Sequence, residues 1–345
     1  MRKQAIKVEE AVGKVLSHDI TKIVAGEFKG PAYKKGHVIT SQDVQELLKL
    51  GKDHVYVLEL DESDVHEDEA GVRLGKAVAG NGTEWKGPKE SRVNIFSSVP
   101  GLLKINIDAL EEINELPNVV MATLPNNTVV KPGDMLAGTK VIPLVVDETD
   151  ISAAENIAQE AGDIIKVVPF IQKKVGIIVT GNEVYKGRIK DTFGPVLSKK
   201  INSYQSEVLE LAYCPDDAEV ISTQISNMVE KGAEMILLSG GMSVDPDDTT
   251  PKGIVLSGAE IIKYGAPALP GAMFLIAYIN DIPILGVPAC GMYFKTTVLD
   301  LVLPRIFVGE KISRKDIIKM AHGGLCQNCA QCSYPNCTFG MGGSL

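Results

Sequence analysis

The chain has 345 residues, of which 45% are hydrophobic and 23% are charged, and this composition excludes a disordered, fibrous or collagen-like protein. Its length predicts two or three domains, each large enough to bury a core of its own. Its formal net charge of −9 argues against a surface that binds a phosphate backbone, so we expect no nucleic-acid partner.

The chain shows no pattern of a targeting or membrane-spanning segment. Its first residues, MRKQAIKVEEAVGKV, lack the continuous apolar run of a signal peptide. The most apolar uncharged run, residues 264–280, is interrupted by Pro267 and Pro270, so we expect no spanning helix. We therefore predict a cytoplasmic protein without a membrane partner.

The first half of the chain predicts two small domains. Residues 1–75 predict an α+β domain, in which VITSQDVQELLKLG is a helix that Ser41 caps and Gly51 ends, and HVYVLEL is a strand. Residues 76–173 predict a separate mixed αβ or β-rich domain. In that domain LLKINIDALEEINEL is helical in part, and VVKPGDMLAGTKVIPLVV is rich in β-branched residues.

Residues 174–310 change to a repeated pattern of strand, loop and helix. KVGIIVTG, EMILLSGG, MFLIAYI and IPILGV are apolar runs, as expected of strands buried on both faces. We predict one helix that begins at Pro195 and includes Val208 and Leu209, and a second over about residues 217–231. The predicted fold class is α/β: a three-layer αβα domain with a mostly parallel sheet, whose ligands bind beyond the carboxyl ends of the strands.

Two strand ends carry acidic loops marked by glycine, TGNEVYKGRIKDT and SGGMSVDPDDTTPKG. Gly240 and Gly241 let the backbone approach a ligand closely, and a helix near Pro251 would present N–H groups to an anion such as phosphate. The loop carboxylates that could hold Mg²⁺ are Asp191, Asp216, Asp217, Asp245, Asp247 and Asp248. Helix capping is the competing interpretation for Asp216 and Asp248.

Motifs in these loops resemble a known domain. TGNEV, GRIKDT, PDD and LSGGMSVDPDDTT, in this order and spacing, resemble the molybdopterin-binding domain shared by the MogA, MoeA and gephyrin proteins of molybdenum cofactor biosynthesis. Upstream, AVGKVLSHDIT, KKGHVIT, LLKLGKDHVYV and VKPGDMLAGTKVIPL resemble the amino-terminal region of MoeA-like proteins. The resemblance covers roughly residues 1–305 and is strongest over 174–250.

The resemblance implies a ligand, a set of site residues and partners. The ligand would be molybdopterin or its adenylylated form, held with Mg²⁺ while molybdate is inserted by positioning and electrostatics. The substrate-binding residues would be Thr180, Gly181, Asn182, Glu183, Gly240, Gly241 and Ser243. The catalytic acids would be Asp191, Asp217 and Asp248. The resemblance also implies a homodimer and, as recipient of the cofactor, a molybdenum apoenzyme.

Two loops depart from the MoeA pattern. MoeA-like enzymes usually carry PGKP and later LPGNP, whereas this chain has PGAM at 270–273 and VPACG at 287–291. The missing lysine removes a charge-assisted contact with an oxyanion worth about 1.5 to 3 kcal/mol, which is roughly tenfold to hundredfold in affinity. Two functions therefore stay open: a molybdotransferase, or a non-catalytic carrier, chaperone or sensor. Cys290 either contacts the ligand's sulfur or packs as a small buried thiol.

Residues 311–345 predict a cysteine-rich metal-binding tail in place of the small β domain that ends MoeA-like proteins. Cys326, Cys329, Cys332 and Cys337 form CxxCxxCxxxxC, and four such thiolates can close a shell around one metal centre. Three consecutive CxxC steps favour an iron–sulfur cluster; zinc and a metal-free redox tail are the alternatives. We expect the metal, rather than apolar burial, to supply the folding free energy of this tail.

Overall fold

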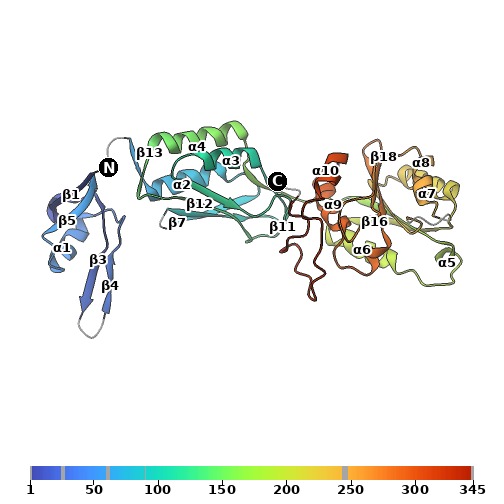
Figure 1. Cartoon of the computed structure of the whole chain (residues 1–345), viewed down its shortest axis with the longest axis horizontal. Coiled ribbons are helices and arrows are strands. Elements are labelled where there is room, and N and C mark those ends of the chain that lie inside the picture. Colours follow the sequence, from blue (N-terminus) through green and yellow to red (C-terminus); the bar gives the residue numbers. More distant parts are fainter. Residues whose placement is uncertain (1, 25–27, 60–62, 90, 243–247, 343–345) are drawn as a thin grey trace. The chain divides into compact units, whose positions relative to one another are not determined.

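The computed structural model describes residues 2–24, 28–59, 63–89, 91–242 and 248–342, and the chain divides into two compact units (Figure 1). The first unit comprises Met1–Phe96, Asn106–Thr123 and Gly133–Lys166. The second unit comprises Ser97–Ile105, Leu124–Pro132 and Val167–Leu345. Both units combine helices with strands, and the candidate site lies in the second.

Among its described residues, the first unit contains one three-stranded and one four-stranded sheet, besides two sheets of only two strands. In the three-stranded sheet, β5 (His54–Glu59) pairs with β1 (Arg2–Lys7) and β2 (Val15–Leu16), and helix α1 (Ser41–Lys49) lies in the same segment of the chain. The four-stranded sheet has the order β10 (Val119–Thr123), β12 (Met135–Val141), β8 (Arg92–Ser97), β7 (Thr83–Lys89). The remaining elements are η1 (Val8–Glu10), β3 (Ile20–Val24), β4 (Phe28–Tyr33), β6 (Asp64–His66), α2 (Glu67–Val78), α3 (Ile107–Glu115), β13 (Val145–Asp147) and α4 (Glu148–Ala161).

Helix α1 forms in the predicted segment, but its cap and its first residue each lie one position earlier than predicted. Thr40 precedes the first helical residue, and its backbone N–H donates to Asp43 Oδ2 at 2.8 Å. The carboxylate near the start of the helix satisfies an N–H group that the helix itself leaves unpaired. The predicted cap, Ser41, is therefore wrong by one position.

Helix α2 was not predicted, and the domain boundary expected after residue 75 falls inside it. Gly71 and Gly75 lower the helix propensity of this segment and hide its periodicity. The structure gives a packing reason for Gly71, because a Cβ there would lie 2.2 Å from the carbonyl oxygen of Ser91. The division of the chain into four domains stays a prediction.

The second unit is built on a six-stranded sheet that is mostly parallel, as predicted. Its order is β16 (Glu207–Cys214), β15 (Lys174–Thr180), β17 (Met235–Ser239), β20 (Ile282–Val287), β19 (Leu275–Ile279), β18 (Glu260–Tyr264). The first four strands are parallel, and β19 and β18 are antiparallel to their neighbours. All five residues of β17 are buried, as expected of a strand covered on both faces.

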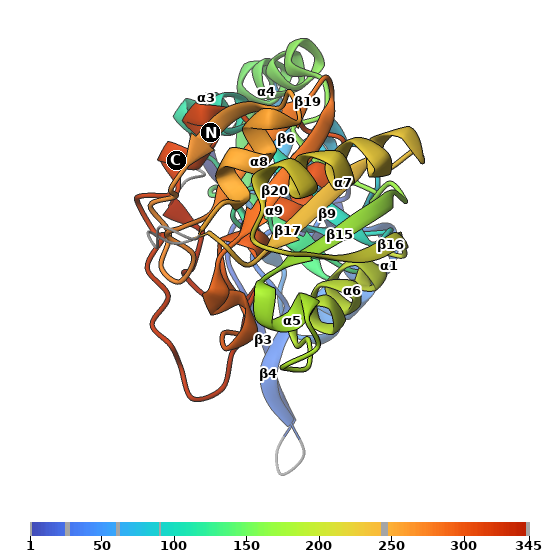
Figure 2. The same cartoon turned by 90° about the vertical axis from the view of Figure 1, so that its right-hand side faces the viewer.

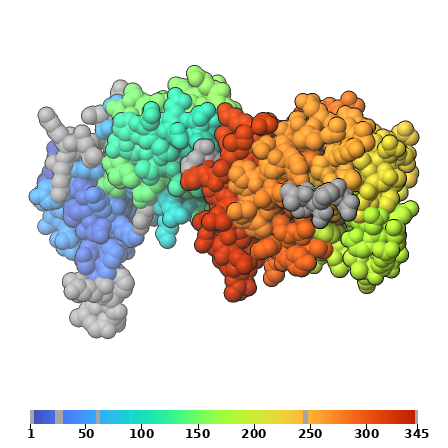
Figure 3. Space-filling view, turned by 45° about the vertical axis from the view of Figure 1, so that its right-hand side comes forward, coloured from blue at the N-terminus to red at the C-terminus, as the bar shows by residue number. Residues whose placement is uncertain are grey.

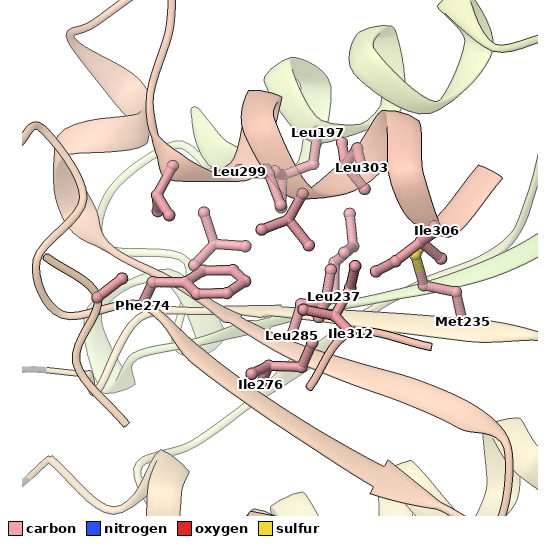
Figure 4. Packing of buried hydrophobic residues seen from close by; sticks show 14 of the residues in the cluster. Leu197, Met235, Leu237, Phe274, Ile276, Leu285, Leu299, Leu303, Ile306 and Ile312 are labelled. Atoms are coloured by element: carbon pink, nitrogen blue, oxygen red, sulfur yellow. The ribbon is translucent and has the colours of Figure 1, made fainter. Parts of the chain in front are cut away.

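Helices cover both faces of this sheet and complete the three-layer fold (Figure 2). On one face α6 (Phe193–Ser203) and α9 (Val298–Phe307) bury the leucines at 197, 299 and 303 against Leu237, Ile276 and Leu285 (Figure 4). On the other face α7 (Ala218–Glu230) and α8 (Thr250–Leu256) bury Ile221, Ile225 and Ile254 against Ile178, Ile236 and Leu238. Each fully buried side chain of this kind contributes about 1.5–3 kcal/mol.

Helix α6 is shorter than predicted, and the strand after it was missed. Helix α6 begins at Phe193 rather than Pro195 and ends at Ser203. Gln205, with a φ of +56°, breaks the helical backbone, and Val208 and Leu209 then lie in β16 rather than on the helix. The prediction that these two residues extend the helix is therefore wrong.

The remaining short elements of the chain are β9 (Gly101–Ile105), β11 (Val129–Val130), β14 (Ile165–Val168), α5 (Asn182–Tyr185), η2 (Ala289–Met292) and α10 (Arg314–Lys319). Strands β11, β9 and β14 form a small sheet in that order. Across the residues that the structure describes, no helix is long and apolar enough to cross a membrane.

The tail beyond α10 folds into loops and turns that lie against the preceding residues of the second unit, red beside orange in Figure 3. Phe339 is 3% exposed, and the Tyr334 hydroxyl donates to the carbonyl oxygen of Asp300 at 2.9 Å. The N–H of Gly340 donates to Gly323 at 2.9 Å, so the loop between them is closed at its base. The expectation that apolar burial contributes nothing to this tail is therefore wrong.

Candidate functional site

The loops after β15 and β17 meet at the carboxyl edge of the sheet. The Thr180 hydroxyl donates to the carbonyl oxygen of Ser239 at 3.2 Å and lies 3.0 Å from the Thr250 hydroxyl. A Cβ at Gly240 would lie 2.1 Å from the carbonyl oxygen of Thr180, and Gly240 has a φ of +93°. Only glycine fits there, because both the backbone conformation and the approach of the two loops exclude a side chain.

We predict that Thr180→Val lowers the free energy of unfolding by about 1–3 kcal/mol, because it removes both buried hydrogen bonds of the hydroxyl while keeping the shape of the side chain. Thr180→Ser keeps the hydroxyl and should lose less. Urea unfolding of the two variants measures the difference. No loss in Thr180→Val, or a larger loss in Thr180→Ser, would show that the hydroxyl does not hold the loops together.

A cavity of about 490 Å³ opens beside these loops, within the size range of small-molecule sites. Three segments line it: Gly240–Met242 together with Asp248, Leu269–Met273, and Pro288–Cys290. Its walls are mostly apolar. Among the described lining residues, Asp248 carries the one charged side chain, and none is a lysine or arginine.

Neighbouring residues fix the walls of this pocket. The Tyr264 hydroxyl donates to the carbonyl oxygen of Met242 at 2.8 Å, and burial, then the charge of Asp248, raise the pKa of this tyrosine. Gly271 has a φ of +130°, and a Cβ there would lie 2.5 Å from Val298 Cγ1. The N–H of Val298, at the start of α9, donates to the carbonyl oxygen of Pro270 at 3.2 Å. The second wall is therefore packed directly on α9.

Two of the three predicted catalytic acids lie outside the pocket lining and cap helices. Asp217 Oδ1 accepts the N–H groups of Glu219 and Val220 at 2.9 and 3.1 Å, at the start of α7. Asp191 Oδ1 accepts the N–H of Phe193 at 2.8 Å, at the start of α6. Such bonds stabilise the first turn of a helix by about 0.5–2 kcal/mol.

The other residues predicted from the first loop bond within their own loop and to residues at the end of β16 and just after it. Asp216 Oδ2 accepts the N–H of Asn182 at 2.8 Å, and the N–H of Gly181 donates to the carbonyl oxygen of Cys214 at 3.1 Å. The carbonyl oxygen of Glu183 accepts the N–H of Arg188 at 2.8 Å within the same loop. Thr180, Gly181, Asn182 and Glu183 are absent from the described lining of the pocket.

Part of the predicted site cannot be placed. Ser243, Asp245 and Asp247 lie outside the described residues, in the segment between Met242 and Asp248. Of the predicted site residues, the structure gathers Gly240, Gly241 and Asp248 at the pocket and puts Thr180 directly behind them.

The site prediction missed the two apolar walls. PGAM and VPACG were visible in the sequence only as departures from a family pattern, yet residues 270–273 and 288–290 line the pocket. Cys290 is half-buried there, and burial raises its pKa. The thiol therefore faces the cavity as a largely neutral group near pH 7.

Comparison with known proteins identifies this part of the chain. Residues 176–307 match the family model described as "probable molybdopterin binding domain". The match covers the segment in which the loop motifs resemble that domain, and it supports the resemblance there. Residues 5–59 match a model described only as a domain of unknown function.

Known relatives match a short part of the chain. CinA-like proteins of Mycobacterium tuberculosis and Mycobacterium leprae are 32% identical over 93 and 80 residues, which is 27% and 23% of this chain and 22% and 19% of theirs. This chain thus matches about a fifth of their length. Among solved structures, a molybdopterin biosynthesis enzyme MoaB from Thermus thermophilus is 19% identical over 40% of this chain and 98% of its own, with a TM-score of 0.33.

The four tail cysteines line one cavity of about 240 Å³, together with Tyr293–Thr296. All four are free, and Cys329 and Cys332 are exposed. In the described ranges, no group of three or more His, Cys, Asp or Glu side chains stands close enough to hold a metal ion. The predicted metal centre therefore stays a prediction.

Proposed function

We propose that the molybdopterin-binding domain binds molybdopterin, or its adenylylated form, in the pocket beside Gly240, and that the protein acts in molybdenum cofactor biosynthesis. The observation that carries this proposal is the contact between Gly240 and Thr180, which joins the two motif loops of the family into one support for the pocket. The position at the carboxyl ends of parallel strands, where such folds bind ligands, supports it too. Apolar walls suit the flat ring system of a pterin.

The chemistry of the pocket fits a Mg²⁺ ion held mainly by the ligand. Mg²⁺ is commonly bound by one or two carboxylates together with substrate phosphates, and it keeps several waters. Asp248 supplies one carboxylate at the pocket, while Asp191 and Asp217 bind helix N–H groups. We assign Asp248 as a ligand of Mg²⁺, and we propose that Asp191 and Asp217 position the loops by binding helix N–H groups. When bound, the ion would neutralise the charge of the ligand's phosphate.

Asp248→Asn should weaken molybdopterin binding about tenfold to a hundredfold at saturating Mg²⁺, because one charge-assisted contact to the ion is lost. With Mg²⁺ chelated, the variant should bind as tightly as the unchanged protein or tighter, since the neutral amide does not repel phosphate. Fluorescence titration measures both affinities. Glu219→Gln removes the same charge from an exposed site and is the control. An equal loss with and without Mg²⁺ would contradict the assignment.

The proposed reaction is molybdate insertion by a MoeA-like molybdotransferase. A second candidate function, a non-catalytic carrier, chaperone or sensor of molybdopterin, is favoured by the lack of a cation in the described pocket lining. Anaerobic incubation of the purified chain with molybdopterin, molybdate and Mg²⁺, followed by reconstitution of a molybdenum apoenzyme, separates the two. A transferase produces active cofactor, whereas a carrier releases the bound molybdopterin unchanged and no active cofactor forms.

Ala272→Lys should restore the charge of the PGKP pattern. Ala272 is exposed at the rim of the pocket, so the longer side chain has room. We expect the molybdopterin-loaded variant to bind molybdate about tenfold to a hundredfold more tightly than the unchanged protein. Ala272→Met adds length without charge and should leave molybdate binding unchanged. Equilibrium dialysis with molybdate measures the two affinities. An equal effect of both variants would argue against the view that the missing lysine weakens molybdate binding.

The proposal includes a homodimer and a molybdenum apoenzyme as recipient of the cofactor. Light scattering of the purified chain at several concentrations tests the dimer. A constant monomer mass would remove that part of the proposal without affecting the pocket.

A further inference from the structure

The four tail cysteines surround one cavity with complementary chemistry. Segment 326–337 supplies four sulfur atoms, and Lys295 adds a positive charge to the lining. The N–H of Asn328 donates to Cys326 Sγ at 3.5 Å, and the Thr296 hydroxyl lies 3.4 Å from Cys332 Sγ. Hydrogen bonds to sulfur and a nearby cation both stabilise the negative charge of a thiolate centre.

The loop that carries the cysteines can close around a metal without disrupting a regular element. Between Cys326 and Cys337 the chain forms turns and bends, with no helix or strand. Its base is fixed by the bond between Gly340 and Gly323 and by the buried Phe339 next to Gly340. Only the loop between these fixed points has to contract around the metal. The fold has therefore already removed much of the conformational entropy that metal binding would otherwise have to remove.

The cysteine loop is bonded directly to one wall of the ligand pocket. The N–H of Cys326 donates to the carbonyl oxygen of Leu269 at 2.8 Å, and the N–H of Leu269 donates to the carbonyl oxygen of Gly324 at 2.7 Å. Leu269 lines the ligand pocket. The backbone at the first cysteine is therefore paired directly with the backbone of that wall.

The loop also reaches the other wall of the pocket and the helix behind both. Residues 293–296 line the cysteine cavity. They begin three positions after Pro288–Cys290, the segment that lines the ligand pocket. The Tyr334 hydroxyl donates to Asp300 in the first turn of α9, where Val298 packs on Gly271. Three separate connections thus join the two cavities.

We propose that Cys326, Cys329, Cys332 and Cys337 bind one thiophilic metal centre, an iron–sulfur cluster or a zinc ion, and that its binding orders both walls of the neighbouring ligand pocket. Each thiol releases its proton when it ligates the metal, and four soft thiolates complete the shell. The effect on molybdopterin rests on the proposed function, whereas metal binding and ordering of the walls do not.

The metal is tested on the full chain purified without oxygen, by iron, sulfide and zinc analysis and by visible absorption. Brown protein with iron and sulfide identifies a cluster, colourless protein with about one zinc per chain identifies zinc, and either supports the proposal. Cys329→Ser should reduce metal retention at least about tenfold. Gln327→Ser changes an exposed residue of the same loop and should retain the metal. Absence of both metals after reconstitution, or equal loss in the two variants, overturns the proposal.

The ordering effect is tested by hydrogen exchange of peptides that cover residues 269–273 and 288–296, with and without the metal. Exchange should slow about tenfold or more with metal bound, and should not respond to metal in Cys329→Ser. Metal binding that leaves both segments unchanged overturns the coupling. If the walls become ordered but no molybdopterin binds in either state, the proposed function fails and the metal-dependent ordering stands.

Discussion

Gly240→Ala should abolish measurable molybdopterin binding, whereas Gly232→Ala should leave it intact. The two glycines have nearly the same backbone conformation, with φ of +93° and +90°. At Gly232 an added Cβ would meet nothing within 4 Å, but at Gly240 it would lie 2.1 Å from the carbonyl oxygen of Thr180. Each substitution lowers stability by about 1–2 kcal/mol, because alanine is placed in a left-handed backbone conformation. Gly240→Ala alone must also push the two loops apart.

The displacement at Gly240 acts on the site itself. A shift of about 1 Å in a positioning group can cost on the order of a hundredfold in function, so we expect at least that loss of affinity. Titration with molybdopterin, together with urea unfolding of both variants, separates binding from stability. Equal affinities for the two folded variants would show that the joined loops do not support the pocket.

Arg305→Met should lower the free energy of unfolding by about 3–5 kcal/mol, because it leaves the half-buried Asp316 carboxylate without its cation and removes one of the two cations that pair with Glu310. Arg305 Nε donates to Glu310 at 2.7 Å and its NH2 group donates to Asp316 at 2.8 Å, and the arginine side chain is 16% exposed. Lys104 also pairs with Glu310, at 2.5 Å. Arg314→Met removes an exposed arginine nearby and should change stability little. Urea unfolding at neutral pH compares the two.

The same cluster predicts how stability depends on pH. Burial alone would raise the pKa of Asp316, but hydrogen bonds from Ser313 and Arg305 outweigh it and lower the pKa from 3.8 to about 2. A lowered pKa in the folded state stabilises the protein above the ordinary carboxyl pKa, and this contribution is lost as the pH falls from about 4 to 2. The loss should be shallower in Arg305→Met. Identical pH profiles would mean that Arg305 does not hold the carboxylate charged.

The central strands were predictable because burial on both faces makes them apolar throughout. KVGIIVTG and IPILGV predicted β15 and β20 with little error, and glycine and proline marked where they end. Strand β16 was missed because it lies at the edge of the sheet and its two glutamates stand three residues apart, a spacing that suits a helix as well. The residue that separates it from α6, Gln205, gives no sequence signal of its positive φ.

The site was predictable where glycine and acid motifs mark it and unpredictable where distant loops complete it. Gly240 and Asp248 were identified from their loop, but Asp191 and Asp217 resemble metal ligands and helix caps equally, and only the hydrogen bonds distinguish these roles. The link from Cys326 to Leu269 joins segments more than fifty residues apart. Such contacts depend on the packing of the whole second unit, which no local pattern records.

The most direct test of the central claim is a crystal structure of the full chain with molybdopterin and Mg²⁺. The account predicts the ligand's phosphate beside Gly240 and Gly241, its ring against Leu269–Met273 and Pro288–Cys290, and the ion on Asp248. A ligand bound elsewhere on the chain, with this pocket empty, would contradict the account.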